Sequence, residues 1–188
     1  MNTIERRGHT IRVLFSAEEI AARNAELARE VAQRAGNDLL VVPVLKGSFI
    51  FAADLIRSLY TAGLSPEVEF ISLASYGEAM ESAGHVTVLR DVEGDVRGRT
   101  VMLIDDILES GRTLAYAKDL LVARGAKAVL TCVLLDKPGR RNAEIDADFV
   151  GFTCPDMFVV GYGMDVAHAF RELPFVGVVE KGGAKQES

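Results

Sequence analysis

The sequence predicts an α/β fold, in which helices flank a mainly parallel, twisted sheet. Short, continuous apolar runs occur at residues 39–45, 101–104 and 127–135, and each has the length of a strand buried on both faces. Segments of helical length and pattern precede or follow these runs over the first two thirds of the chain. Strands that alternate with helices favour a parallel sheet.

Composition limits the class of protein. The 188 residues are 49% apolar and 26% charged, which suits one globular domain spanning residues 1–188 with a sizeable core. A net charge of −6 argues against general binding to nucleic acid or to anionic membranes. No apolar run approaches the ~20 residues that span a bilayer. Because Cys132 and Cys154 have no metal-site spacing, we expect two reduced, buried thiols in a cytoplasmic protein.

The first helix and the first strand have clear boundaries. Ser16 and Glu19 form a capping box, so a helix is predicted from there to about Ala35. The strand at 39–45 contains Pro43, and because proline cannot donate to a ladder, we expect an irregular end or an unpaired side there. Lys46-Gly47-Ser48 follows this strand, and residues 49–60 read as a mostly buried helix.

A hairpin is predicted next. Residues 67–75 and 85–89 alternate well enough for two strands, and the polar loop between them opens with Ser75, Tyr76 and Gly77. Two strands around a polar loop fit a hairpin whose tip moves.

The run from Val101 to Thr113 organises the chain. Asp105 and Asp106 are expected at the carboxyl end of the 101–104 strand, a glycine-containing turn follows, and an amphipathic helix runs from Thr113 to before Gly125. Free N–H groups at a helix N-terminus hold phosphate, whereas paired carboxylates suit hydroxyls or a metal. A sugar diol that carries a 5-phosphate meets both requirements. The alternative is a strand with two solvated aspartates and a capped helix.

The last third supplies more polar groups at strand ends. Lys137 follows the 127–135 strand, at the edge expected for Lys46 and Asp105, where its ammonium could donate to a ring carbonyl. Short strands are predicted at 148–152, 158–162 and 175–180. Without other information Phe158 and Tyr162 would be core aromatics.

These motifs together resemble a known family. The run from Val101 to Thr113 is similar to the phosphoribosyl pyrophosphate (PRPP) signature of the type I phosphoribosyltransferases, and the chain from about Leu39 to Gly182 resembles their hypoxanthine-guanine branch. The resemblance implies a core at about 16–135 and a small hood formed mainly by about 136–182, with N-terminal residues as a further candidate for the hood. It also implies transfer of the phosphoribosyl group of PRPP to N9 of hypoxanthine or guanine, giving IMP or GMP and pyrophosphate. Mg²⁺ and a homodimer or homotetramer are implied too.

The resemblance also assigns residues. Lys46 and Gly47 would bind pyrophosphate, often with a cis peptide before the lysine, and Arg171 would approach the same group. The loop with Ser75 and Tyr76 would close over the site. Asp105, Asp106 and Asp165 would contact magnesium, and the acid pair would hold the diol. The expected phosphate cradle consists of Ser110, Gly111, Arg112 and Thr113. Lys137 would recognise O6 of the purine, Phe158 would stack on it, and the main chain of Val159 would meet its exocyclic position.

Two departures from the family pattern bear on mechanism. Glu109 stands where the family usually has aspartate, so its carboxylate, the candidate general base, lies one methylene further out; orienting the purine by hydrogen bonding is the alternative role. Asp136 precedes Lys137, where its carboxylate could pair with the ammonium and soften its charge. A xanthine, adenine or pyrimidine enzyme of the same fold stays open, as does a PRPP-binding regulator. A Rossmann-type nucleotide binder is disfavoured because no Gly-x-Gly-x-x-Gly follows a strand.

Overall fold

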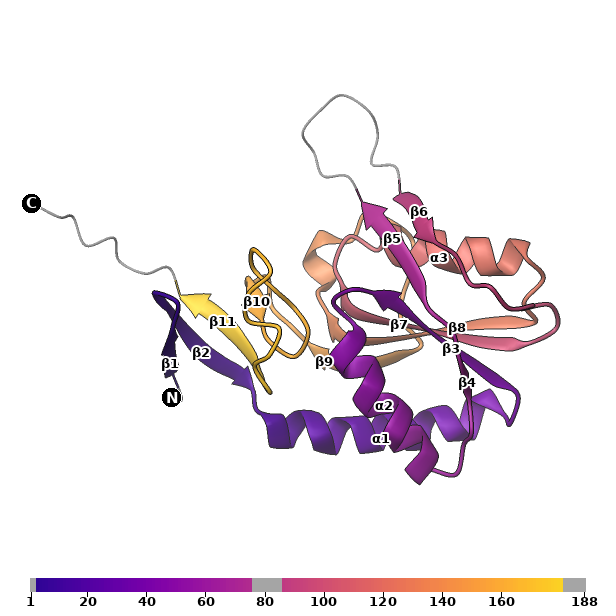
Figure 1. Cartoon of the computed structure of the whole chain (residues 1–188), viewed down its shortest axis with the longest axis horizontal. Helices are drawn as coiled ribbons and strands as arrows, with labels where there is room; N and C mark the ends of the chain where they lie inside the picture. The colour runs from indigo at the N-terminus through magenta and orange to yellow at the C-terminus, as the bar shows by residue number, and fades with distance from the viewer. Residues whose placement is uncertain (1–2, 76–85, 181–188) are drawn as a thin grey trace, which may run out of the picture.

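The main sheet confirms the predicted fold class. The structure is a computed structural model that describes residues 3–75 and 86–180. Within those residues the sheet has seven strands in the order β6-β5-β3-β7-β8-β9, with β4 also pairing with β3 (Figure 1). Every pairing is parallel except that of β5 with β6. The strands are β3 (Leu39–Leu45), β4 (Glu67–Val68), β5 (Ile71–Ser75), β6 (Val86–Arg90), β7 (Thr100–Leu108), β8 (Ala128–Asp136) and β9 (Phe149–Thr153).

Helices cover both faces of this sheet. In Figure 1, α1 (Ala17–Ala35) and α2 (Phe49–Thr61) lie on one face and α3 (Arg112–Ala123) lies on the other. Alternate residues of β7 serve the two sides: Met102 and Ile104 pack in the cluster with α1 and α2, and Val101 and Leu103 pack with α3. Burial on both faces explains why β7 begins as an unbroken apolar run.

Helix α1 begins and is anchored as its sequence suggests. The amide of Glu19 donates to Oγ of Ser16 at 3.2 Å, and the amide of Ser16 donates to Oε2 of Glu19 at 2.8 Å, which confirms the capping box.

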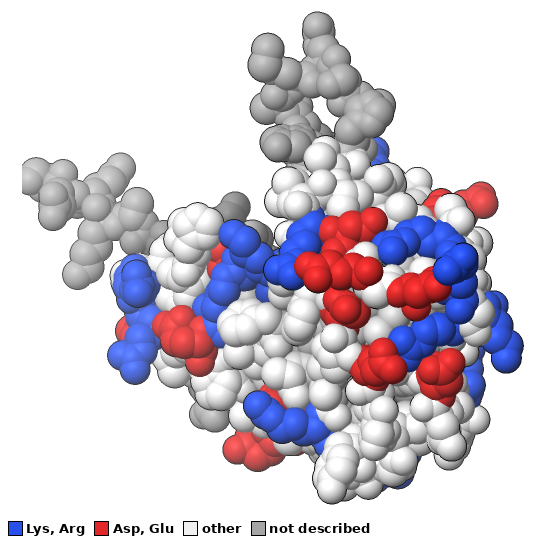
Figure 2. Space-filling view, turned by 45° about the vertical axis from the view of Figure 1, so that its right-hand side comes forward, with Lys and Arg blue, Asp and Glu red and all other residues white. Residues whose placement is uncertain are grey.

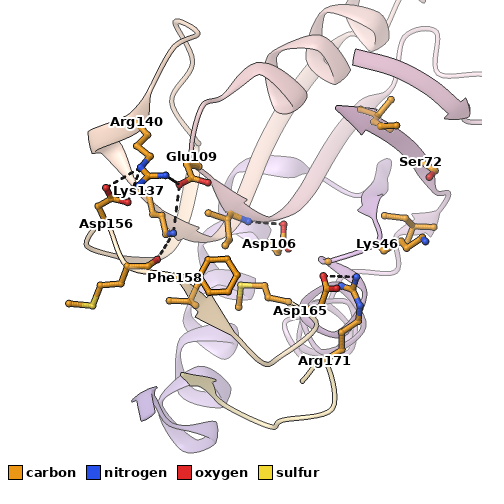
Figure 3. Close-up of a pocket in the computed structure, with 18 of the residues that line it drawn as sticks. Lys46, Ser72, Asp106, Glu109, Lys137, Arg140, Asp156, Phe158, Asp165 and Arg171 are labelled. Carbon is orange, nitrogen blue, oxygen red and sulfur yellow. Dashed lines mark hydrogen bonds and ion pairs between the residues drawn. The ribbon is translucent and has the colours of Figure 1, made fainter. Parts of the chain in front are cut away.

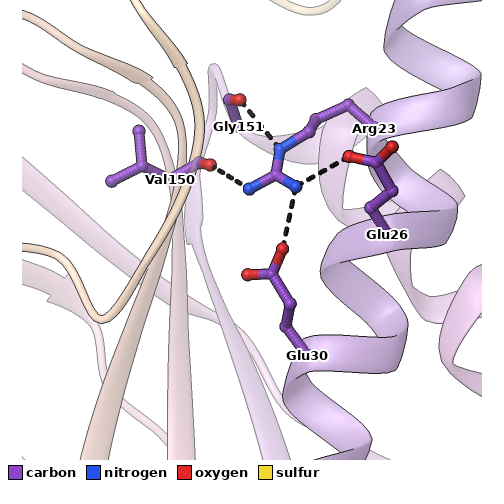
Figure 4. Close-up of polar contacts among 5 residues, drawn as sticks. All are labelled: Arg23, Glu26, Glu30, Val150 and Gly151. Atoms are coloured by element: carbon purple, nitrogen blue, oxygen red, sulfur yellow. Dashed lines mark hydrogen bonds and ion pairs between the residues drawn. The ribbon is translucent and has the colours of Figure 1, made fainter.

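Arg23 joins this helix to the edge strand β9 (Figure 4). Its guanidinium donates to the carbonyl oxygens of Val150 and Gly151 at 2.8 and 3.0 Å. It also pairs with Glu26 and Glu30 of its own helix at 2.9 and 2.8 Å, so one side chain links segments 128 residues apart.

A second, antiparallel sheet has the order β1-β2-β11-β10. Its strands are β1 (Thr3–Arg6), β2 (His9–Phe15), β10 (Val159–Val160) and β11 (Val176–Glu180). N-terminal residues therefore lie in one sheet with residues assigned to the hood. Strand β9 also falls in the range assigned to the hood, yet it extends the main sheet beyond residue 135. The division into core and hood stays a prediction.

Several strand boundaries differ from the predicted ones. Strand β7 continues to Leu108, because Ile107 and Leu108 pair with Leu135 and Asp136, so the acid pair lies within the strand instead of after it. The strand expected at 67–75 is split into β4 and β5. The split lies beside Pro43: β4 pairs with Leu40 and Val41, and β5 pairs with Val44 and Leu45. This unpaired side next to the proline was predicted.

Charged side chains lie on the surface, and both cysteines lie in the interior. Acidic and basic side chains are interspersed over the face shown in Figure 2. Cys132 and Cys154 are both free and buried, as expected. None of the helices in the described part of the chain has both the length and the apolar composition needed to cross a membrane.

Candidate active site

The acid pair lies near the end of β7. Asp105 is buried, and its Oδ1 accepts from the amide of Asp106 at 3.0 Å; Oδ1 of Asp106 accepts from the amide of Ile107 at 2.9 Å. Burial raises the pKa of Asp105 well above its ordinary value, and the neighbouring carboxyl group of Asp106 adds to this. Burial also raises the pKa of Asp106. The pair therefore favours a partner that stabilises its negative charge, such as hydroxyl groups or a cation.

The loop after β3 lies directly against the acid pair. The Leu45–Lys46 peptide is cis, as the family resemblance implied. A Cβ at Gly47 would lie 1.8 Å from Oδ2 of Asp106, so any side chain there would displace the carboxylate or the loop. Ser48 is buried, and its hydroxyl donates to the carbonyl of Val44 at 2.6 Å. The loop thus brings its backbone close to the two carboxylates.

The turn before α3 borders a smaller cavity. Gly111 has φ of +80°, and a Cβ there would lie 2.7 Å from Cγ2 of Ile145. A cavity of about 290 Å³ is lined by Ser110, Gly111 and Thr113 together with Lys46, Gly47 and both aspartates. Arg112 is exposed and does not line this cavity. The sequence placed its side chain in the cradle, and the structure does not bring it there.

A larger cleft of about 810 Å³ adjoins this cavity (Figure 3). Lys46, Gly47 and Asp106 line both spaces. The other predicted residues in its lining are Glu109, Lys137, Phe158, Val159, Asp165 and Arg171. Strand β5 contributes residues 72–74; Ser75 is its last residue, and Tyr76 lies outside the described residues.

Lys137 and Phe158 face the same part of the cleft. Lys137 is buried, and its Nζ donates to the carbonyl oxygen of Met157 at 2.6 Å. Phe158 is 58% exposed, so it is not the core aromatic of the default interpretation. Tyr162, in contrast, is buried. A cation beside an open aromatic face suits a planar, polar ring.

Charged contacts surround Glu109. Its Oε1 lies 3.8 Å from Nζ of Lys137 and 3.4 Å from Nη1 of Arg140 (Figure 3). Nε of Arg140 contacts Oδ1 of Asp156 at 2.9 Å, which links Glu109 to the segment before Phe158. Asp136 does not pair with Lys137 as expected, because it forms an ion pair with Arg141 instead.

The far side of the cleft holds another ion pair. Arg171 donates from Nη2 to Oδ1 of Asp165 at 2.7 Å and from Nη1 to the carbonyl of Gly163 at 2.6 Å. A Cβ at Gly163 would lie 2.3 Å from the carbonyl oxygen of Gly47. This turn therefore packs directly on the loop that carries Lys46.

Comparison with known proteins identifies the family. The phosphoribosyl transferase domain family matches residues 13–167. The chain belongs to the phosphoribosyltransferase family. It is 42% identical over 174 residues to the hypoxanthine phosphoribosyltransferase of Escherichia coli strain K12, an alignment that covers 91% of this chain and 96% of that protein.

Solved structures of other phosphoribosyltransferases share the fold. A hypoxanthine-guanine phosphoribosyltransferase from Bacillus anthracis superposes with a TM-score of 0.83 at 41% identity, covering 89% of this chain and 98% of that chain. A hypoxanthine phosphoribosyltransferase from Trypanosoma cruzi gives a TM-score of 0.86 at 34% identity, with 94% and 95% covered. The suspected family and the mainly parallel α/β fold are thereby confirmed.

Two carboxylates of this phosphoribosyltransferase, those of Asp105 and Asp106, are suited to the magnesium expected for the family. In residues 3–75 and 86–180, no three His, Cys, Asp or Glu side chains gather as a metal cluster. Asp165 is engaged by Arg171. Mg²⁺ commonly uses only one or two carboxylates and takes its other oxygens from water and substrate phosphates, so the hard oxygen donors of Asp105 and Asp106 suit it.

Sequence reasoning missed three contributors to the site. Arg140 belongs to the basic cluster after Lys137, which by itself is typical of a solvated turn; Asp156 and Gly163 carried no motif of their own. The only local signal for Arg140 was its place two residues after Pro138, close to the end of a predicted strand. Its partner Glu109 could not be inferred from spacing because 31 positions separate the two in the chain.

Proposed function

We propose that this phosphoribosyltransferase joins the phosphoribosyl group of PRPP to N9 of hypoxanthine or guanine, giving IMP or GMP and pyrophosphate. One observation carries the proposal: a single cleft has Asp106 of the acid pair and Lys46 at one end and Lys137 with Phe158 at the other. The first set suits a sugar phosphate, and the second suits a flat ring with a carbonyl group. The hypoxanthine phosphoribosyltransferases among its relatives support the same assignment.

The PRPP half of the site follows from the two joined cavities. The 5-phosphate would occupy the smaller one, where Ser110, Thr113 and the start of α3 offer hydroxyl and amide donors. Asp105 and Asp106 would accept hydrogen bonds from the ribose diol, which explains the use of buried carboxylates whose charge needs a partner. Lys46, the amide of Gly47 and Arg171 would hold the pyrophosphate.

We include Mg²⁺ in the proposal, held by Asp105 and Asp106 with Asp165 nearby. When bound, it would supply positive charge to the leaving pyrophosphate. Lys46 and Arg171 would act on the same charge from the protein side, because both residues line the cleft together with Gly47.

The purine half sets the choice of base. The ammonium of Lys137 donates hydrogen bonds and cannot accept them, so it favours a 6-oxo group over a 6-amino group. Phe158, exposed on the cleft, offers a ring for stacking, and Val159 offers its main chain. Lys137 would exchange its present acceptor, the carbonyl of Met157, for O6 of the purine.

Glu109 is proposed to take the proton that the purine loses. The bond from N9 to C1 of the ribose forms as the bond from C1 to pyrophosphate breaks, and the displaced proton passes from the purine to the carboxylate. Glu109 lines the cleft within 3.8 Å of Lys137 and 3.4 Å of Arg140, on the side where the base would lie. These cations would direct the longer side chain and so offset the extra methylene.

Product formation from PRPP and Mg²⁺ tests the function, with guanine, hypoxanthine, xanthine, adenine and uracil offered separately. We expect turnover of guanine and hypoxanthine, with adenine and uracil inert. Turnover confined to xanthine, adenine or uracil would keep the family and refute the role of Lys137. Retained PRPP binding without any turnover would indicate a regulator.

Glu109→Gln tests the general base. Because the amide cannot accept the proton, we expect kcat to fall by at least about 100-fold. The Kd for PRPP should stay within about twofold, measured by calorimetry. Glu93→Gln, at an exposed glutamate paired with Arg90, serves as the matched control. Turnover unchanged by Glu109→Gln would remove this residue from the mechanism.

A cytoplasmic location and a homodimer or homotetramer complete the proposal. Both rest on the resemblance to the family. Light scattering coupled to size-exclusion chromatography measures the assembly, and a monomeric mass would refute that part alone.

A further inference from the structure

The turn from Gly161 to Asp165 connects the two ends of the cleft. It follows β10, which adjoins Phe158, and it ends at the aspartate that pairs with Arg171. Its backbone is held by hydrogen bonds from the amide of Tyr162 to Leu173 O at 2.8 Å and from the amide of Gly163 to Arg171 O at 3.1 Å. The turn is therefore a structural joint between the base end and the pyrophosphate end.

Tyr162 adopts a costly conformation at the centre of this turn. Its φ is +50°, in the left-handed region, where a residue with a Cβ incurs about 1–3 kcal/mol. Glycine occupies the positions on both sides, but not this one. A strained tyrosine between two glycines indicates that the side chain itself is needed.

The side chain of Tyr162 contacts both helices on that face of the sheet. Its hydroxyl donates to Oδ2 of Asp54 in α2 at 2.7 Å and accepts from Nδ2 of Asn24 in α1 at 2.9 Å. Burial and the adjacent carboxylate of Asp54 raise the pKa of the phenol, so the hydroxyl keeps its proton and donates.

This hydrogen-bond network is not optimised for stability alone. Oδ1 of Asn24 is buried without a hydrogen-bond partner in the described part of the chain. A buried unsatisfied acceptor costs about 1–3 kcal/mol, and an apolar cluster of the same shape would avoid that cost. The network therefore calls for an explanation beyond packing.

Helix α2 carries the effect of this contact to the pyrophosphate loop. It begins at Phe49, directly after Lys46, Gly47 and Ser48. The opposite side of the turn touches the same loop, because Gly163 packs against the carbonyl of Gly47. The turn therefore contacts this loop and its helix at two points: Tyr162 bonds to Asp54 in α2, and Gly163 packs on Gly47 in the loop.

We propose that Tyr162 is a positioning residue: its hydrogen bonds to Asp54 and Asn24 hold the Gly161–Asp165 turn against the pyrophosphate loop. In that position the turn keeps Arg171, bonded to Gly163 and Asp165, beside Lys46. The inference rests on the proposed function, since it names which end of the substrate depends on Tyr162. It assigns the effect to the pyrophosphate end and not to the purine.

Tyr162→Phe removes only the hydroxyl, so it tests this inference without emptying the core. We expect kcat/KM for PRPP to fall about tenfold, while the KM for hypoxanthine stays within twofold. Tyr60→Phe is the matched control, because Tyr60 lies on helix α2 with Asp54 but is 76% exposed. Equal changes in the KM values for both substrates would overturn the proposal.

A double-mutant cycle distinguishes positioning from general stabilisation. Asp54→Ala alone should produce a similar loss, and adding Tyr162→Phe to it should cause little further change in kcat/KM for PRPP, because both remove one contact. Independent, multiplying losses would refute the contact as the cause. A lowered Tm without a selective loss for PRPP would show that Tyr162 only stabilises the fold.

Calorimetric titration with magnesium pyrophosphate separates this inference from the proposed function. We expect pyrophosphate to bind Tyr162→Phe about tenfold more weakly than it binds the wild type. Absence of turnover on every purine, with this difference still present, would refute the proposed function alone. Equal pyrophosphate affinity in the two proteins would refute the positioning role.

Discussion

The close approach of Gly47 to the acid pair gives the sharpest prediction. In Gly47→Ala the new Cβ would lie 1.8 Å from Oδ2 of Asp106 and 2.7 Å from its Cγ. Because Cβ contacts stay beyond about 3.0 Å, either the loop or the carboxylate must move by roughly 1 Å. A displacement of ~1 Å in a catalytic site costs about 100-fold in rate, or about 2.7 kcal/mol. We therefore expect kcat/KM for PRPP to fall by about that factor.

Initial rates at varied PRPP and saturating hypoxanthine measure this effect, with thermal unfolding recorded in parallel. Overpacking of a tight site also costs about 1–3 kcal/mol of stability, so a modest fall in Tm should accompany the loss of activity. Gly94→Ala is the control, because its nearest contact, Oε1 of Glu69, would be an ordinary 3.6 Å away. A Gly47→Ala enzyme within threefold of the wild type, with an unchanged Tm, would refute the geometry.

Three further variants test other features. Phe158→Ala should raise the KM for hypoxanthine about tenfold and leave that for PRPP unchanged, because base stacking on an aromatic ring is worth about 1–3 kcal/mol; steady-state kinetics decide this. Burial alone would raise the pKa of Asp148, but hydrogen bonds from Thr131 and Arg34 lower it below 3.8. Its charge therefore adds stability that is present above about pH 3.8 and is lost as the pH falls through the lowered pKa. Asp148→Asn should lower the Tm at pH 7 and lower it progressively less as the pH falls below 3.8, and an equal effect at every pH would contradict this. Arg23→Ala should lower stability by about 1–2 kcal/mol in denaturant unfolding, because two carbonyls of β9 lose their donor.

The parts of the fold that were predictable are those with strong local signals. The capping box at Ser16 and the apolar runs that became β3 and β8 are local patterns, and the structure keeps them. Strands β1 and β2 were not predicted, because Thr3–Arg6 is polar and mostly exposed, and pairing of β2 with β11 depends on residues more than 160 positions away. Propensity in one window carries no information on such a partner.

The site was predictable where a motif marks a strand end. Lys46, Asp106 and Lys137 converge because parallel strands bring their carboxyl ends to one edge of the sheet. The exposed side chain of Arg112 shows that a position in a motif does not fix where a side chain points at the start of a helix. The Arg140–Glu109 contact depends on how the segment after β8 folds back, which no local pattern records.

The joining of β2 to β11 has a consequence for how the protein is made. During synthesis β1 to β8 emerge before β10 and β11, so the acid pair and the pyrophosphate loop leave the ribosome before the rest of the site. Strand β10, which adjoins Phe158, gains its neighbour β11 only when residues 176–180 have left the ribosome. A nascent chain thus exposes Lys46 and the acid pair before Phe158 and Arg171, so the two halves of the site are completed together only when the C-terminal strands have emerged.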